Sequence, residues 1–224
     1  MKTLAIAIIM ICSFSACHSS SSDAPEIEQN DQTDVVKLVE KRNLKAVEDA
    51  LKAGINVNSA DASNRNLLLI ATNNRDFEMV KLLLKYKADV NQQADNLDSP
   101  FLYAGATGQT EMVKLFLANG ARFDLFNRYN GSALIPACER GHVETVRLLA
   151  NTKGYPINHI NKLGWTALME AIVLGDGTKK YQEIVQILKD AGSKMDIPDK
   201  DRITPLQHAK NRGFIEIAKI IEAT

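Results

Sequence analysis

The chain has 224 residues, of which 45% are apolar and 24% are charged, a composition normal for a soluble globular protein of one or two domains. Lysine plus arginine and aspartate plus glutamate both number 27, so no net charge indicates a nucleic acid or an anionic surface as partner. The three cysteines, Cys12, Cys17 and Cys138, do not form the pattern of a disulfide framework.

Residues 1–16 have the pattern of a secretory signal peptide: Lys2 gives a positive end, and Leu4–Ile11 is an unbroken apolar run of eight residues. That run is shorter than the roughly 20 residues that span a bilayer. The following FSAC, which ends at Cys17, resembles the lipobox of bacterial lipoproteins, although leucine is commonest where Phe14 stands. The resemblance implies that Cys17 is lipidated and becomes the mature N-terminus. Cleavage without lipid, for example after Ser15, is the alternative.

Residues 17–30 are rich in serine and contain no apolar run, which predicts a flexible tether. The thirteen residues from His18 to Asn30 reach roughly 20 Å, enough to hold a folded domain away from a bilayer. His18, and not aspartate, follows the cysteine, and by resemblance to enteric lipoproteins this favours the outer membrane. We therefore expect an exported protein of the bacterial cell envelope that faces the periplasm, or alternatively a soluble periplasmic or secreted one.

Residues suited to capping a helix recur at spacings of 33, 33, 33, 34 and 38 from residue 33 onward. A large apolar residue follows each two positions later, and a small or apolar residue, mostly alanine, follows five positions later. Serine, threonine and asparagine at such positions accept hydrogen bonds from free N–H groups. The pattern predicts a helix, a turn, a leucine-rich helix and a loop, repeated six times. The capping residues are Thr33, Asn66, Ser99, Ser132, Thr166 and Thr204.

Residues Thr204–Ala209 read TPLQHA, close to the TPLHxA signature of the ankyrin repeat, and Gly141-His142 matches that family's Gly-His turn. The resemblance extends over residues 31–224. It implies an all-α, ankyrin-repeat solenoid of stacked helix-turn-helix units with hairpin loops. Each unit needs its neighbours to bury its apolar face. The first and last units, which depart most from the pattern, are expected to act as caps.

Two departures from the repeat give local expectations. Residues Asp176–Lys180 form an insertion of about five residues in the fifth unit, expected between its two helices. Gly54, Gly120 and Gly192 follow the second helix, where a left-handed cap is usual, but Lys87 occupies this place in the second unit.

The residues indicate no catalytic site, cofactor or metal. No histidine is paired with a second ligand at metal-binding spacing, and neither a glycine-rich phosphate loop nor a serine nucleophile elbow is present. Cys138 falls at a small-residue position in the fourth unit and is expected to be buried. His142 is expected to bond the backbone between units.

The ankyrin resemblance implies a partner-binding face formed by the hairpin tips and the exposed side of each first helix. Tyrosine, tryptophan and arginine dominate interface energies, and Arg128, Tyr129, Arg140 and Trp165 fall in adjacent units, where they are expected to form one patch. Packing of both rings within their own units is the alternative. The nine predicted partner-binding residues are Arg65, Asn73, Asp95, Asp98, Arg128, Tyr129, Arg140, Lys162 and Trp165.

The predicted function is that of a non-catalytic protein-protein interaction scaffold in the envelope. We expect a monomer that binds another protein, reaches the membrane only through its lipid anchor and does not bind nucleic acid. Two alternatives are an immunity or accessory protein for an exported toxin or lipolytic enzyme, and a structural envelope protein.

Overall fold

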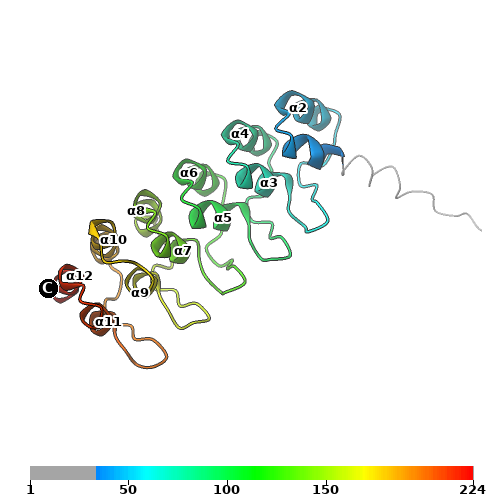
Figure 1. The fold of residues 1–224 in the computed structure, drawn as a ribbon. Helices are drawn as coiled ribbons and strands as arrows, with labels where there is room; N and C mark the ends of the chain where they lie inside the picture. The colour runs from blue at the N-terminus through cyan, green and yellow to red at the C-terminus, as the bar shows by residue number, and fades with distance from the viewer. Residues whose placement is uncertain (1–33, 224) are drawn as a thin grey trace, which may run out of the picture.

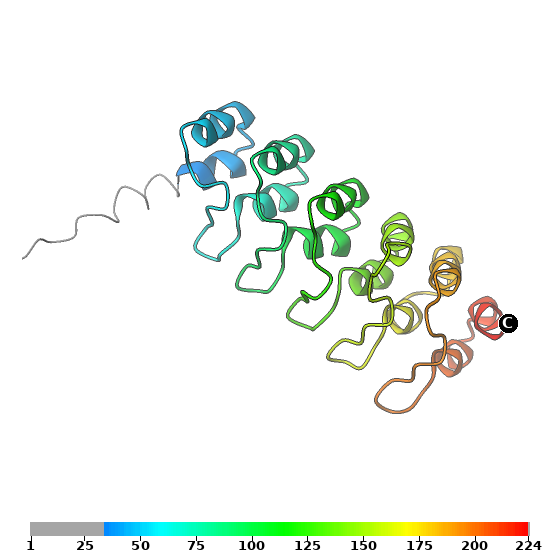
Figure 2. The ribbon, with the colours of Figure 1, turned by 180° about the vertical axis from the view of Figure 1, so that it is seen from behind.

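The computed structural model describes residues 34–223. Helix pairs stack side by side along one axis, and a loop projects on the same side between successive pairs (Figures 1 and 2). The predicted signal peptide, the tether with Cys17, and the capping residue Thr33 lie outside the described residues. Within residues 34–223 the only β-type pairing is an isolated bridge between Ala60 and Asn66, so the loops are hairpins without strands.

The helices form two rows, with the loops beside the inner row (Figure 1). Each unit contributes one helix to each row, and contacts join neighbouring units within both rows. The inner helices are residues 34–40, α3 (Leu67–Asn73), α5 (Pro100–Ala106), α7 (Leu134–Glu139), α9 (Ala167–Val173) and α11 (Pro205–Asn211). The outer helices are α2 (Leu44–Lys52), α4 (Phe77–Lys85), α6 (Thr110–Ala118), α8 (Val143–Ala150), α10 (Lys179–Asp190) and α12 (Ile215–Glu222).

Four inner helices begin at the capping residues predicted from the sequence. The side chains of Asn66, Ser99, Thr166 and Thr204 each accept the backbone N–H three residues ahead. At Thr204 the side chain of Gln207 also accepts the N–H of the cap, which completes a capping box. These bonds satisfy N–H groups that a helix start leaves free.

The prediction that Ser132 caps the fourth inner helix is wrong. Helix α7 begins at Leu134, and Ala133 stands at its N-cap with right-handed dihedral angles and no side-chain cap. The reason is a tyrosine further along the chain, because the hydroxyl of Tyr155 accepts the N–H of Leu134 at 3.1 Å. A side chain from the following loop thus replaces the local serine cap.

The core is one continuous apolar layer between the two rows of helices. Small residues recur along the inner row, where neighbouring helices approach most closely. A Cβ atom added at Gly105 would lie 2.6 Å from the Cβ of Ala133, so only glycine fits there. Cys138 is fully buried beside this seam, and burial raises the pKa of its thiol. The alanines at the predicted small positions are all fully buried: Ala71, Ala104, Ala137, Ala171 and Ala209.

Side-chain bonds to backbone carbonyls tie neighbouring units at the turns between their helices. Arg75 donates to the carbonyl of Thr107 at 3.0 Å, and Arg140 donates to that of Ala106 at 2.7 Å. His142 bonds the backbone of Ala106, as expected for the Gly-His turn. Bonds of this kind couple each unit only to its neighbours, as in other solenoids.

The cap positions after the outer helices are left-handed as predicted. Gly54, Gly120 and Gly192 have φ angles of 96°, 84° and 83°, and Lys87 adopts the same region with φ of 67°. The insertion differs from its prediction, because Lys179 and Lys180 are the first residues of α10, which has 12 residues. The added residues therefore extend the outer helix as well as the turn.

Candidate partner-binding groove

In the second, fourth, fifth and last units, the hairpin is stiffened by one side chain five residues before the unit's predicted capping position, whereas the third unit has Ala94 there. The Oδ1 atom of Asn161 accepts the N–H groups of Leu163 and Trp165 at 2.9 and 3.0 Å. Asp61, Asn127 and Asp199 form the same pair of bonds in their own hairpins. Exposed side chains at these tips are consequently held on an ordered backbone.

Backbone bonds join the hairpin tips in pairs. The N–H of Asp95 donates to Ser63 at 3.1 Å, which joins the second and third units, and the N–H of Lys162 donates to Tyr129 at 2.9 Å, which joins the fourth and fifth. Within residues 34–223 no equivalent bond joins the tips of the third and fourth units. The last tip is likewise joined to the fifth only through a side chain, because Lys200 donates to the carbonyl of Lys162. Between the third and fourth hairpins the link is also a side chain, since the amide of Gln93 donates to the carbonyl of Phe126 at 2.9 Å.

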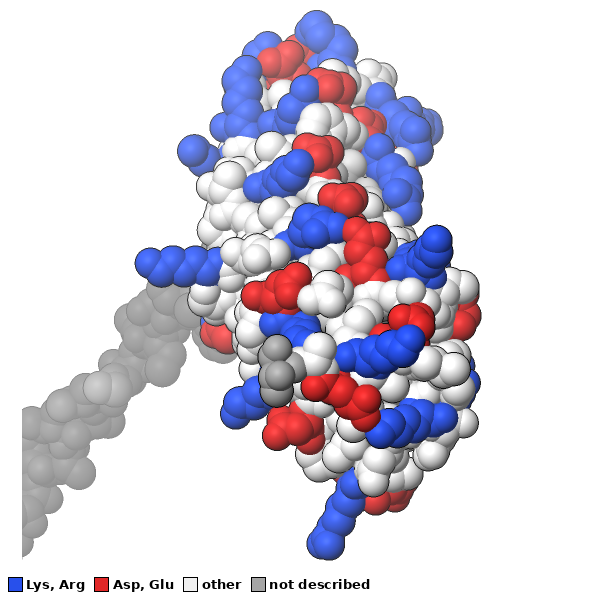
Figure 3. All heavy atoms as spheres, turned by 90° about the vertical axis from the view of Figure 1, so that its left-hand side faces the viewer, with Lys and Arg blue, Asp and Glu red and all other residues white. Residues whose placement is uncertain are grey.

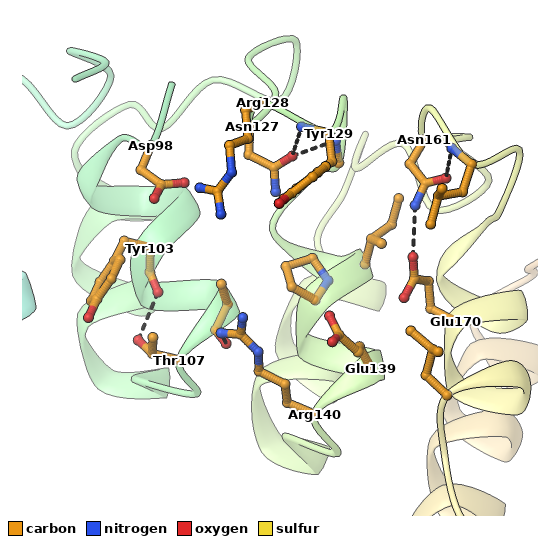
Figure 4. A pocket seen from close by; sticks show the side chains of 16 residues that line it. Asp98, Tyr103, Thr107, Asn127, Arg128, Tyr129, Glu139, Arg140, Asn161 and Glu170 are labelled. Atoms are coloured by element: carbon orange, nitrogen blue, oxygen red, sulfur yellow. Dashed lines mark hydrogen bonds between the residues drawn. The ribbon is translucent and has the colours of Figure 1, made fainter. Parts of the chain in front are cut away.

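A pocket of about 430 Å³ opens at this place, on the loop side of the inner helices (Figure 4). Three consecutive units supply its walls: Asp98 and Tyr103 from the third, Pro136 from the fourth, and Leu163 from the fifth. Polar and charged side chains point into it from both hairpins and helices (Figure 4). The remaining lining residues are Ala106, Thr107, Asn127, Arg128, Tyr129, Gly131, Ile135, Glu139, Arg140, Asn161, Glu170 and Leu174.

One position of the inner helices explains why the pocket forms here. Tyr103, Pro136 and Glu170 each stand four residues after their unit's capping position, so their side chains occupy equivalent places in successive units. The short proline ring of the fourth unit thus stands between the longer tyrosine and glutamate side chains of its neighbours. The pocket thus lies where the short side chain of Pro136 leaves room between Tyr103 and Glu170.

The charges that line the pocket are divided between its two ends (Figure 4). At the third-unit end, burial raises the pKa of Asp98, and the nearby charges of Arg128 and Arg140 partly oppose that rise. At the fifth-unit end, burial and the charge of Glu139 raise the pKa of Glu170 to about 7. A bond of 2.8 Å from the amide of Asn161 to Glu170 opposes the rise only in part.

Of the nine predicted residues, four line the pocket: Asp98, Arg128, Tyr129 and Arg140. Tyr129 is 57% exposed, and the guanidinium of Arg128 lies 4.6 Å from the centre of its ring. The phenol and the guanidinium thus form one exposed cation–π pair at the rim of the pocket.

The other five predicted residues lie outside the pocket. Arg65 forms a 2.6 Å ion pair with Asp61 of its own hairpin. Asp95 accepts a 2.6 Å bond from Asn64, and Lys162 donates at 2.7 Å to the carbonyl of Arg128. Asn73 and Trp165 are half-buried and are not among the lining residues, so the structure does not place Trp165 beside Tyr129 in the pocket.

Sequence reasoning missed Glu170 and Tyr103, although both fall on the inner helices. The sequence of α9, ALMEAIV, contains one signal, which is a lone glutamate in an otherwise apolar helix. In the structure this residue, Glu170, is only 4% exposed. Buried charges are rare without a partner or a function. A glutamate in such a helix, one unit away from a proline at the equivalent position, marks the pocket.

Across residues 34–223, no three histidine, cysteine or acidic side chains gather as metal ligands would. None of the helices in this range has both the length and the apolar character needed to cross a bilayer. The end of the solenoid that carries α12 presents acidic and basic side chains interspersed, with no extended field of one sign (Figure 3).

The stacked helix pairs with hairpin loops define a repeat protein of the ankyrin class. The family described as ankyrin repeats (3 copies) matches residues 35–127 and 101–199, more than half of the chain. The chain therefore belongs to the ankyrin repeat family. Ankyrin repeats generally mediate binding to another protein, and proteins of this kind are typically non-enzymatic.

Relatives of similar length support the assignment. The chain is 33% identical to the ankyrin repeat protein YahD of Escherichia coli (strain K12) over 196 residues, covering 87% of this chain and 97% of that protein. The crystal structure of an ankyrin repeat domain from Acinetobacter baumannii AYE is similar with a TM-score of 0.82 and 42% identity, covering 85% and 96% of the two chains. The ankyrin repeat protein EF0377 is similar with a TM-score of 0.81 and 37% identity, covering 84% and 95%.

Proposed function

We propose that this chain is a non-catalytic scaffold that binds another protein through the pocket of the third to fifth units and the hairpin tips around it. The observation that carries the proposal is the exposed Arg128–Tyr129 pair at the rim of a 430 Å³ pocket. Rigid aromatic and arginine side chains beside a concave surface are the usual anchors of an interface.

We propose further that binding takes place at the bacterial cell envelope, with the protein held by a lipid on Cys17. Support comes from the sequence of residues 1–30, which has an apolar run, a lipobox-like FSAC and a serine-rich stretch. A tether of that length leaves the groove accessible to a partner near the membrane surface.

The experiment captures the partner from an envelope extract with the full chain and then titrates it against single variants. Tyr129→Ala is expected to weaken binding about 30-fold, since an anchoring aromatic that is buried on binding contributes about 2 kcal/mol. Trp165→Ala tests the predicted patch separately, because Trp165 lies outside the pocket. Circular dichroism confirms that each variant is folded.

The control is Ala62→Ser with Asn211→Ser, in the second and last units, where exposed residues lie away from the pocket. These changes are expected to leave the affinity unchanged. Unaltered binding by Tyr129→Ala would move the interface away from the pocket. The inserted turn at residues 176–178, before α10, is then the next surface to test.

A further inference from the structure

We infer that the fifth-unit end of the pocket receives a basic side chain, a lysine or an arginine, from the protein partner, between the carboxylates of Glu139 and Glu170. The inference rests on the proposed function and names the chemistry that the pocket recognises. It starts from two acidic side chains that point into the same space from α7 and α9 (Figure 4).

In the part of the chain that the structure describes, neither carboxylate has a counter-charge in an ion pair. No ion pair within residues 34–223 includes Glu139 or Glu170. Glu170 is only 4% exposed, and one of its oxygens accepts the Asn161 amide at 2.8 Å. Its second oxygen has no hydrogen-bond partner in the described part of the chain. A buried carboxylate left in this state gains most from a cation that arrives with the ligand.

The two arginines of the pocket do not fill this role. Arg140 uses its guanidinium to bond the carbonyl of Ala106 at 2.7 Å, and Arg128 stacks on Tyr129. Their charges act on Asp98 at the opposite end, whereas Glu139 is the charged group that acts most strongly on Glu170. The acidic groups Glu139 and Glu170 are therefore the charged lining residues at the fifth-unit end.

The apolar surface beside the two carboxylates fits the stem of a long basic side chain. Leu163 and Leu174 line the same end of the pocket and are 52% and 49% exposed. Lysine and arginine lay their methylene groups on apolar surface while the charged head reaches a polar site. A lysine or arginine side chain bound at this end would cover both leucines and place its charged head near Glu139 and Glu170.

The test titrates the isotope-labelled full chain in detergent solution with capped tripeptides, followed by the NMR signals of Asn161, Leu163 and Glu170. Ac-Ala-Arg-Ala-amide and Ac-Ala-Lys-Ala-amide are compared with norleucine and glutamate analogues of the same length. We expect saturable shifts with arginine or lysine at affinities at least about fivefold higher than with norleucine, which has the apolar stem without the charge.

Glu139→Gln and Glu170→Gln are each expected to remove that preference. Glutamine at position 170 retains an oxygen that can accept the Asn161 amide, so this variant keeps the internal bond. Glu144→Gln is the matched control, since Glu144 lies on the outer helix α8 of the same unit as Glu139 with its side chain 73% exposed. It should bind the basic tripeptides as the unaltered chain does.

Equal affinity for all four peptides, a preference for glutamate, or a basic preference that survives both glutamine variants would overturn the inference. None of these outcomes requires the natural partner. If the captured partner needs Tyr129 but the tripeptides show no preference, the proposed function stands. Only the inference that the pocket receives a basic side chain is then overturned.

Discussion

The hydroxyl of Tyr155 lies 3.1 Å from the backbone nitrogen of Leu134 and accepts its N–H, 21 positions back along the chain. The same hydroxyl bonds Ser132, and burial raises the pKa of Tyr155 to about 12. A tyrosine in the loop after α8 thereby bonds the first residue of α7, the helix that carries Pro136.

Tyr155→Phe is expected to lower the free energy of unfolding by about 1–2 kcal/mol, because it leaves a buried N–H without its acceptor. Urea unfolding followed by circular dichroism measures the change. Tyr86→Phe is the control, since the hydroxyl of half-buried Tyr86 forms no hydrogen bond within the described range, and it should change stability little. Equal effects of the two substitutions would contradict a capping role for Tyr155.

Lys87→Gly is expected to raise the free energy of unfolding by about 0.5–1 kcal/mol, because glycine adopts the left-handed region without the cost that a Cβ imposes. Lys87 is exposed and has φ of 67°, so the substitution loses little packing. The reciprocal change Gly120→Lys should cost a similar amount, since no atom lies within 4 Å of a Cβ placed there. A destabilised Lys87→Gly variant in urea melts would show that the lysine side chain contributes a contact of its own.

Glu170→Gln is expected to change stability in a pH-dependent way. The pKa of Glu170 rises from its ordinary value of 4.5 to about 7 in the folded chain, so between these values the folded state holds a proton that the unfolded state releases. The stabilisation that comes from the protonated Glu170 is therefore fully present below pH 4.5 and is lost as the pH rises through 7.

Glutamine, which does not titrate, should stabilise the chain relative to glutamate by about 1–3 kcal/mol more at pH 8 than at pH 5. Urea melts of both proteins at the two pH values give this difference. Glu144→Gln, at an exposed site on α8, should show no comparable difference. A Glu170→Gln effect that is the same at both pH values would mean that Glu170 is ionised throughout.

Cys17→Ser is expected to abolish the uptake of labelled fatty acid and to release the protein from the detergent-extracted membrane fraction, because only a thiol at this position can carry the lipid. Radiolabelling with palmitate and fractionation measure the two effects. Cys12→Ser, inside the predicted signal peptide, is the control and should leave labelling intact. Labelling that persists in Cys17→Ser would contradict the lipobox.

The repeat could be predicted from the sequence because the regular spacing of a few residue types is enough to show it. Capping residues near every 33 positions and alanines five positions later specify inner helices that must approach closely. The cap at Ser132 could not be predicted correctly, because its competitor, Tyr155, acts from the loop after α8, 21 residues beyond Leu134. The insertion at Asp176–Lys180 was found, but its division between turn and helix depends on how α10 packs against α8.

The candidate site was only partly predictable. Arg128 and Tyr129 follow from their place in the hairpin and from their residue types. The pocket, however, depends on Tyr103, Pro136 and Glu170 standing side by side, which becomes visible only when equivalent positions are compared across units. No single unit contains the pocket, and neither the direction in which Glu139 points nor the pairing of Arg128 with Tyr129 follows from spacing.

The pairwise joining of the hairpin tips gives this solenoid an uneven elasticity. Tips held by the Asp95–Ser63 and Lys162–Tyr129 bonds move as pairs, whereas in residues 34–223 no such bond spans the third and fourth tips. Curvature should therefore concentrate, when the stack is bent, at the two junctions whose tips share no backbone bond in the described part of the chain: third to fourth and fifth to last. The pocket opens across the first of these junctions, so the width of its mouth depends on the curvature there.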